Sequence, residues 1–183
     1  MTAETPLPRS LAPQEPDIES MVRVNQAGEF GATRIYAGQL AVMGDRTPAA
    51  RLIARMALQE ARHRQHFDRL IAARGVRPTL LAPFWDRAGH ALGVVTALIG
   101  PEAAMACTEA VETEIDRHYA DQLRALGDGD PPLAATVAEF QAEEIEHRDT
   151  ATREGAANAP GYPLLTGAIR LGCRVAIALS KRI

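Results

Sequence analysis

The sequence predicts an all-α protein, in which a four-helix bundle is joined by two further helices. Aromatic residues make up only 4% of the chain, while Ala, Leu, Ile and Val dominate its apolar residues, a composition that suits packed helices. No stretch shows the sustained alternation of a strand. A Glu-x-x-His pair occurs twice, at Glu60 and His63 and again at Glu144 and His147, each time inside a helical segment.

Length, charge and cysteine usage limit the number of domains and exclude some classes of function. At 183 residues the chain is one domain long and can bury a substantial core. The net charge of −3 gives no sign of nucleic-acid binding. Cys107 and Cys173 form no Cys-x-x-Cys motif, so no zinc ribbon or rubredoxin-type iron site is encoded, and we expect reduced core thiols.

The N-terminal segment and the longest apolar run bear on location. Residues 1–16 contain four prolines and lack the apolar region of a signal peptide, so we expect a mobile tail before one domain at residues 17–183. The longest apolar run, residues 88–101, includes His90 and is too short to span a bilayer. These features predict a soluble or peripheral protein.

Start and stop signals divide the remaining chain into six helices. Asp17, Thr47 and Asp130 suit N-caps, Pro48 suits the first helical position, and Gly75 suits a C-terminal end. The expected helices cover residues 17–43, 48–74, 84–99, 101–126, 131–154 and 164–180.

Two half-sites repeat along the chain. One glutamate precedes each Glu-x-x-His pair, and corresponding positions of the two halves differ by 83 or 84 residues. Residues three apart share a helix face, so each pair directs a carboxylate and an imidazole to one point. Two hairpins packed face to face would gather six side chains at one level: Glu29, Glu60, His63, Glu112, Glu144 and His147.

This residue set predicts a metal site. Four carboxylates inside a bundle need compensating charge, because unpaired ions in a low dielectric cost many kcal/mol. Two divalent cations would supply it, and oxygen-rich ligands with one histidine per metal favour iron or manganese over zinc. The pattern is that of ferritin-like di-iron and di-manganese carboxylate proteins. The expected fold is therefore a ferritin-like bundle with a short apolar helix at 84–99 and an amphipathic C-terminal helix at 164–180.

Helical spacing assigns other polar residues. Tyr36 and Tyr119 each follow a first glutamate by seven residues, so we expect them on the ligand face, either as core residues bonded to a buried carboxylate or as groups that steer protons. His66 is expected at the surface, and His118 is expected to flank the site. Candidates to hold the histidine nitrogens, for which exposure is the expected alternative, are Glu143, Glu146 and Asp149.

Small residues surround the first glutamate. Gly28 and Gly31 flank Glu29. Because glycine costs about 1 kcal/mol of helix stability relative to alanine, this spacing indicates close approach by a helix or a ligand.

Several motifs resemble the demethoxyubiquinone hydroxylase family of coenzyme Q biosynthesis. They extend over almost the whole chain from about residue 18, and they are RVNQAGEFGA at 23–32, RIYAGQ at 34–39, AMACT at 104–108, EEIEH at 143–147 and GCRVAI at 172–177. The resemblance places the iron ligands on the six residues given above.

The resemblance implies a di-iron monooxygenase that inserts one oxygen atom of O₂ into the ring of a polyprenyl demethoxyubiquinone or its quinol, with iron changing between Fe(II) and Fe(III). That substrate lies in a bilayer. We therefore expect a peripheral protein on the cytoplasmic face of a bacterial inner membrane. The sequence leaves open whether a lipid-presenting accessory protein, as in eukaryotic relatives, is needed.

The helices at 84–99 and 164–180 are the candidates for membrane contact. The last combines apolar residues with four basic ones, which suits anionic headgroups; they are Arg170, Arg174, Lys181 and Arg182. A helix packed on the bundle with a solvated basic face is the equal alternative. Some members of the family have an aromatic residue where Ala178 stands, so the sequence does not support a substrate contact there.

Other functions remain open at this point. A ferroxidase or iron-storage bundle and a di-manganese catalase would use the same ligands, and a helical adaptor would need no metal. No Gly-x-Gly-x-x-Gly loop follows a strand, so electrons would come from NADH bound in another way, from a partner reductase or from the quinol. Oligomeric state and quinone tail length are also open.

Overall fold

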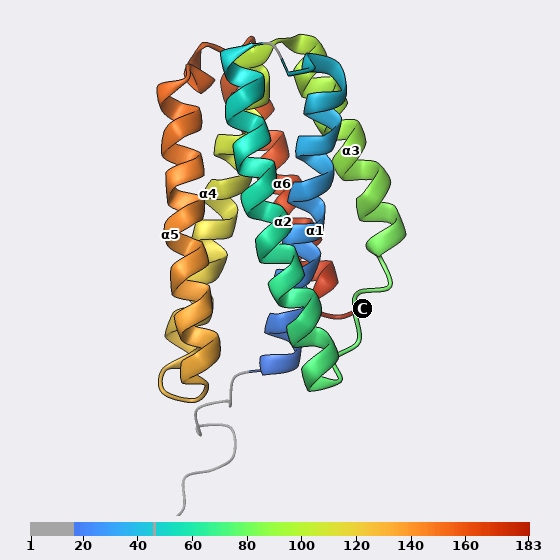
Figure 1. Cartoon of the computed structure of the whole chain (residues 1–183), viewed down its shortest axis with the longest axis vertical. Coiled ribbons are helices and arrows are strands. Elements are labelled where there is room, and N and C mark those ends of the chain that lie inside the picture. Colours follow the sequence, from blue (N-terminus) through green and yellow to red (C-terminus); the bar gives the residue numbers. More distant parts are fainter. Residues whose placement is uncertain (1–16, 46) are drawn as a thin grey trace, which may run out of the picture.

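The computed structural model describes residues 17–45 and 47–183, and no strand occurs in these ranges (Figure 1). The predicted mobile tail, residues 1–16, lies outside the described residues. The all-α class and the six helices are confirmed. The helices are α1 (Ile18–Met43), α2 (Pro48–Arg74), α3 (Ala82–Ile99), α4 (Pro101–Leu126), α5 (Pro131–Arg153) and α6 (Tyr162–Ser180), with a 3-10 turn η1 (Ala156–Asn158) before α6.

Two helices begin earlier than predicted, because a proline lies inside their first turn. Pro83 belongs to the first turn of α3, and Pro163 belongs to the first turn of α6. The N–H that proline lacks has no intrahelical partner at that position, so proline is tolerated there. The predicted starts at residues 84 and 164 were therefore each two residues too late. Helix α5 ends at Arg153, one residue early, and η1 was not predicted.

The predicted caps are present. The side chain of Asp17 accepts a hydrogen bond from the backbone N–H of Ser20 at 3.0 Å, and Thr47 Oγ1 accepts one from Ala50 at 3.0 Å. Gly75 ends α2 in the left-handed conformation, with φ of 65°. A side-chain N-cap contributes about 1 kcal/mol to helix stability, so these local signals fix where the hairpins turn.

The helices form two similar units (Figure 1). Helix α1 packs against α2 and α3, and α4 packs against α5 and α6. Helices α1, α2, α4 and α5 form the predicted four-helix bundle, and the third helix of each unit lies outside it. The duplicated unit is thus three helices long, whereas the sequence repeat indicated a hairpin.

Helix α3 lies against the backbone of α1. A Cβ atom added to Gly93 would lie 2.0 Å from the carbonyl oxygen of Ile35, and one added to Gly38 would lie 2.2 Å from that of His90. No L side chain fits at either glycine without movement of backbone. The approach is tightest at these two glycines. It extends to Gly31, whose carbonyl oxygen would lie 3.1 Å from a Cβ atom added to Gly89 of α3, although a Cβ added to Gly31 itself would meet nothing within 4 Å.

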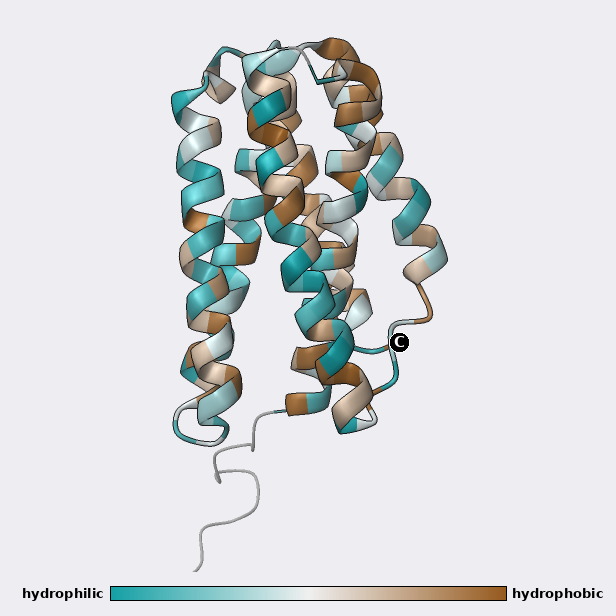
Figure 2. Cartoon of the chain, viewed as in Figure 1, coloured by the Kyte–Doolittle hydropathy of each residue, from teal (hydrophilic) through white to brown (hydrophobic). Residues whose placement is uncertain are grey.

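Apolar side chains remain exposed on α3 and α6. Figure 2 colours the C-terminal end of α3 as hydrophobic. By length and composition, α6 could cross a membrane, and only 11% of its apolar window is buried. The helix nevertheless packs on α4, where Arg170 Nε donates to the buried Glu114 Oε1 at 2.7 Å. The exposed large apolar residues of the two helices are Phe84, Val95, Leu98, Ile99, Leu164, Leu171, Val175 and Leu179.

Candidate metal centre

The structure brings the six predicted ligands together inside the four-helix bundle, and none is more than 3% exposed. Their ligand atoms form two groups in which all atoms lie within 4.8 Å of one another. We call them the His63 position and the His147 position. The first consists of Glu29, Glu60, His63 and Glu144, and the second consists of Glu60, Glu112, Glu144 and His147.

Several of these atoms are buried without a hydrogen-bond partner. They include Nδ1 of both histidines, Oε1 of Glu60 and both carboxylate oxygens of Glu144. His63 Nδ1 lies 3.0 Å from Glu144 Oε1, but the pair lacks hydrogen-bond geometry. An unpaired buried polar atom costs about 1–3 kcal/mol. Cations between these atoms would satisfy them, so the donor set fits two metal ions with Glu60 and Glu144 shared between them.

Burial sets the electrostatics of the cluster. Desolvation, reinforced by the charge of Glu144, raises the pKa of Glu60 and the pKa of Glu112 well above their usual range. Burial alone would lower the pKa of His63, but the adjacent carboxylates of Glu144 and Glu29 raise it to about 10. Protons thus occupy the cluster when metal is absent. Divalent cations would have to displace them, so metal affinity should fall at acidic pH.

Two tyrosines connect the halves across the site. Tyr36 donates a hydrogen bond to Glu112 Oε1 at 3.0 Å, and Tyr119 donates one to Glu29 Oε1. Each tyrosine is 1% exposed, and burial raises the pKa of both well above the usual value. They are therefore protonated donors to the carboxylates. This agrees with the predicted alternative in which each tyrosine is a core residue bonded to a buried carboxylate. A role in steering protons stays a prediction.

The outer nitrogens of the histidines also have partners. His63 Nε2 lies 2.8 Å from Glu143 Oε2, and His147 Nε2 lies 3.0 Å from Gln59 Oε1. Sequence reasoning named Glu143 but missed Gln59, although Gln59 precedes Glu60 as Glu143 precedes Glu144. The other two candidates, Glu146 and Asp149, are exposed and do not contact the histidines.

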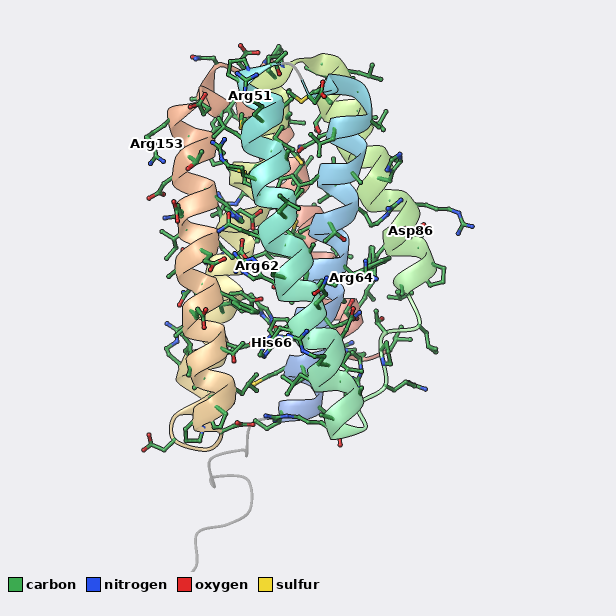
Figure 3. All side chains as sticks on the ribbon, viewed as in Figure 1. Arg51, Arg62, Arg64, His66, Asp86 and Arg153 are labelled. Atoms are coloured by element: carbon green, nitrogen blue, oxygen red, sulfur yellow. The ribbon has the colours of Figure 1, made fainter. Side chains whose placement is uncertain are left out.

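The remaining histidines lie outside both groups. His66, which Figure 3 labels on α2, is half-buried with its ring edge-on to Phe140 at 5.5 Å, so the prediction of a surface position was only partly right. His118 is buried, and its Nε2 lies 2.8 Å from Gln122 Nε2. Burial, with the charge of Lys181, lowers the pKa of His118 to about 4, so it is neutral at physiological pH.

An apolar cavity of about 440 Å³ lies between α1, α3, α4 and α6 and reaches the cluster at Glu29 and Tyr119. Its volume is that of a small-molecule site. Gly28 and Gly31 line it, so the small residues beside Glu29 leave space for a ligand. Sequence reasoning missed the cavity, and these glycines were its only signal. Of the two free cysteines, Cys107 is buried as predicted, while Cys173 is half-buried and lines the cavity.

Comparison with known proteins identifies the family of the chain. The family model for ubiquinone biosynthesis protein COQ7 matches residues 16–180. The chain belongs to this family. It is 50% identical over 182 residues to a 3-demethoxyubiquinol 3-hydroxylase of Rhodospirillum rubrum, covering all of this chain and 85% of the relative.

Eukaryotic members of the COQ7 family are similar over nearly the same length. The chain is 48% identical over 169 residues to the mitochondrial NADPH-dependent 3-demethoxyubiquinone 3-hydroxylase of Mus musculus, covering 90% of this chain and 77% of the relative. It is 42% identical over 182 residues to the mitochondrial 5-demethoxyubiquinone hydroxylase of Saccharomyces cerevisiae, covering 91% and 78%. The family resemblance stated from the motifs is thereby confirmed.

Proposed function

We propose that this member of the COQ7 family is a di-iron monooxygenase, which hydroxylates the ring of a demethoxyubiquinone or demethoxyubiquinol with O₂. The observation that carries the proposal is the apolar cavity, whose lining includes Glu29 of the two-metal cluster. A polyprenyl quinone requires such a site, because its tail must be shielded from water while its ring reaches the metals. The names of the relatives support the same reaction.

The metal ions, when bound, would supply the reductive activation of O₂. The residues of the chain hold and orient the reactants. Apolar side chains of α3 and α6 would exclude water from the tail, and the ring would lie beside Glu29 in the cavity. The neutral His118 also lines the cavity, where it would be available as a hydrogen-bonding group for the ring. Tyr119 holds the carboxylate of Glu29 through its hydroxyl.

The direct test is a single-turnover reaction. The iron-loaded chain is reduced without oxygen, then mixed with O₂ and a short-chain demethoxyubiquinone. We expect one hydroxylated quinone per active site. Oxidation of Fe(II) without this product would instead favour a ferroxidase, and peroxide disproportionation by a manganese form would favour a catalase. Either result in place of hydroxylation would contradict the proposal.

Iron binding is tested separately. Glu144 belongs to both metal positions, so Glu144→Ala should remove most of the iron measured per chain. Retention of two irons by this variant would contradict the assignment of the six ligands.

The proposed electron donor is a nicotinamide dinucleotide. The sequence suggested NADH, and the mouse relative is named NADPH-dependent. Oxidation of each dinucleotide should be measured with and without the demethoxy quinone. Substrate-dependent oxidation of NADH or NADPH supports a direct donor, whereas none with either would indicate a partner reductase.

We also propose that the exposed apolar residues of α3 and α6 contact the surface of the membrane that contains the quinone, at the cytoplasmic face of a bacterial inner membrane. Leu164, Leu171 and Val175 are 83%, 59% and 48% exposed on α6. Changing all three to Glu should abolish co-sedimentation with vesicles of anionic lipid. Leu58→Glu on α2, where Leu58 is 70% exposed, is the matched control. Equal binding of the triple variant and the control would exclude α6.

A further inference from the structure

Gln59 and Glu143 occupy equivalent positions in the two halves of the chain, but only one of them carries a charge. Each directly precedes the glutamate of a Glu-x-x-His pair. Glu143 Oε2 accepts from His63 Nε2 at 2.8 Å, and Gln59 Oε1 accepts from His147 Nε2 at 3.0 Å. Each half thus supports the histidine of the other half, one through a carboxylate and one through a neutral amide.

Contacts around the pair fix these roles. Gln59 Nε2 donates to Glu143 Oε2 at 3.2 Å, which leaves the amide oxygen of Gln59 for His147. Arg62 also approaches Glu143 Oε2, at 3.4 Å, but its side chain is 63% exposed. Solvent therefore screens the charge of Arg62, and Glu143 remains the anionic partner of His63.

The other ligands of the two positions are matched. Both positions share Glu60 and Glu144, and each has one glutamate of its own that accepts a hydrogen bond from a tyrosine. The group that accepts from the outer nitrogen of each histidine is a chemical difference between the two positions. A carboxylate that accepts the N–H of an imidazole makes the other ring nitrogen a stronger metal ligand. A charge-assisted hydrogen bond is about twice as strong as a neutral one.

We propose that Glu143 makes the two metal positions unequal, so that the His63 position binds the first divalent ion and the His147 position binds the second. The proposal rests on the two-metal site of the proposed function. Glu143 and Gln59 are positioning residues, since they act through the histidines and do not belong to either ligand group.

The test measures the order of metal binding rather than activity. Metal-free full-length chain is titrated with Co(II), and a crystal grown with one equivalent shows by anomalous scattering which position is filled. We expect the His63 position in the wild type. Glu143→Gln should weaken that position about 10- to 100-fold, and Gln59→Glu should strengthen the His147 position. The double variant, which keeps the net charge, should reverse the order.

Each result bears on the proposal. Glu146→Gln, at an exposed residue of the same helix, should leave the order unchanged and controls for loss of a carboxylate. Equal filling of both positions in the wild type, or an unchanged order in the double variant, would overturn the proposal while leaving the two-metal site intact. A wild-type chain that binds no Co(II) would overturn both. If Glu143→Gln does not fold, Gln59→Glu decides.

Discussion

Tyr36 in the first half of the chain donates a hydrogen bond to Glu112 in the second half, at 3.0 Å inside the bundle. Tyr119 and Glu29 make the reciprocal bond. The glutamate that precedes each Glu-x-x-His pair is therefore held by a tyrosine of the opposite unit. The carboxylates of the site depend on the packing of the two halves as much as on their own helices.

Tyr36→Phe should fold but lose stability. The change leaves a buried carboxylate oxygen without its donor, which costs about 1–3 kcal/mol. Urea unfolding of the metal-free chain measures this loss of stability. Hydroxylation should also slow, because Glu112 is no longer held by the tyrosine hydroxyl. Tyr162→Phe is the control, because its hydroxyl bonds to Glu109 outside the cluster at 2.8 Å. Equal losses in the two variants would argue against a special role for Tyr36.

Metal stoichiometry should depend on which glutamate is removed. Glu112 belongs only to the His147 position, whereas Glu60 belongs to both. We expect Glu112→Ala to retain about one iron per chain and Glu60→Ala to retain almost none, because only the second change removes a ligand from each position. Elemental analysis after anaerobic loading gives the numbers. The division into two groups would be wrong if both variants lost the same amount.

Helix α3 should be sensitive to one methyl group. An alanine at position 93 would place Cβ against the carbonyl oxygen of Ile35. Forced repacking costs typically 1–3 kcal/mol, so Gly93→Ala should lower the melting temperature. Gly167→Ala on the exposed face of α6, where Cβ meets nothing within 4 Å, should instead stabilise by about 0.5–1 kcal/mol. A tolerated Gly93→Ala would contradict the backbone contact of α1 and α3.

Filling the cavity beside Glu29 should block the substrate without removing metal. Gly31 lines the cavity and has free space at its Cβ. Gly31→Leu should raise KM for a demethoxyubiquinone or abolish turnover while the iron content stays at the wild-type value. Gly31→Ala, which adds one methyl group, should have a small effect. Normal kinetics with leucine would place the substrate elsewhere.

His118 should make stability depend on pH. Burial, with Lys181, lowers the pKa of His118 to about 4 in the folded chain, below the value of about 6.5 in an unfolded one. As the pH falls from about 6.5 to about 4, the unfolded state binds the proton first, so up to about 3 kcal/mol of stability is lost. Urea unfolding of metal-free chain across this range should show a shallower loss in His118→Gln. Parallel curves would refute the assignment.

The fold and the grouping of the six candidate ligands could be predicted because their signals are local or repeated. Caps such as Thr47 and end signals such as Gly75 need only neighbouring residues, and they placed α2 correctly. The six candidate ligands followed from a repeat of 83 or 84 residues combined with helical spacing. Both the cap residues and the repeat can be recognised without knowing how the helices pack.

The rest depends on contacts between distant helices. The bond from Gln59 to His147 joins α2 to α5, and a glutamine before a glutamate carries no signal by itself. The cavity exists because α3 and α6 lie beside α1 and α4, which in turn requires Gly93 to meet the backbone of Ile35. The contact of Arg170 with the buried Glu114 could not be predicted either, because a basic residue on an amphipathic helix is expected to face solvent.

Three ligands of each metal position come from one unit of the chain and the fourth, Glu60 or Glu144, comes from the other. A polypeptide with only one unit could offer three donors and no more. Two identical copies of such a half-length chain, related by a two-fold axis, would complete both positions at once. An ancestor built that way would have been active only as a dimer, and fusion of two gene copies would have turned its subunit interface into the interior of the present bundle.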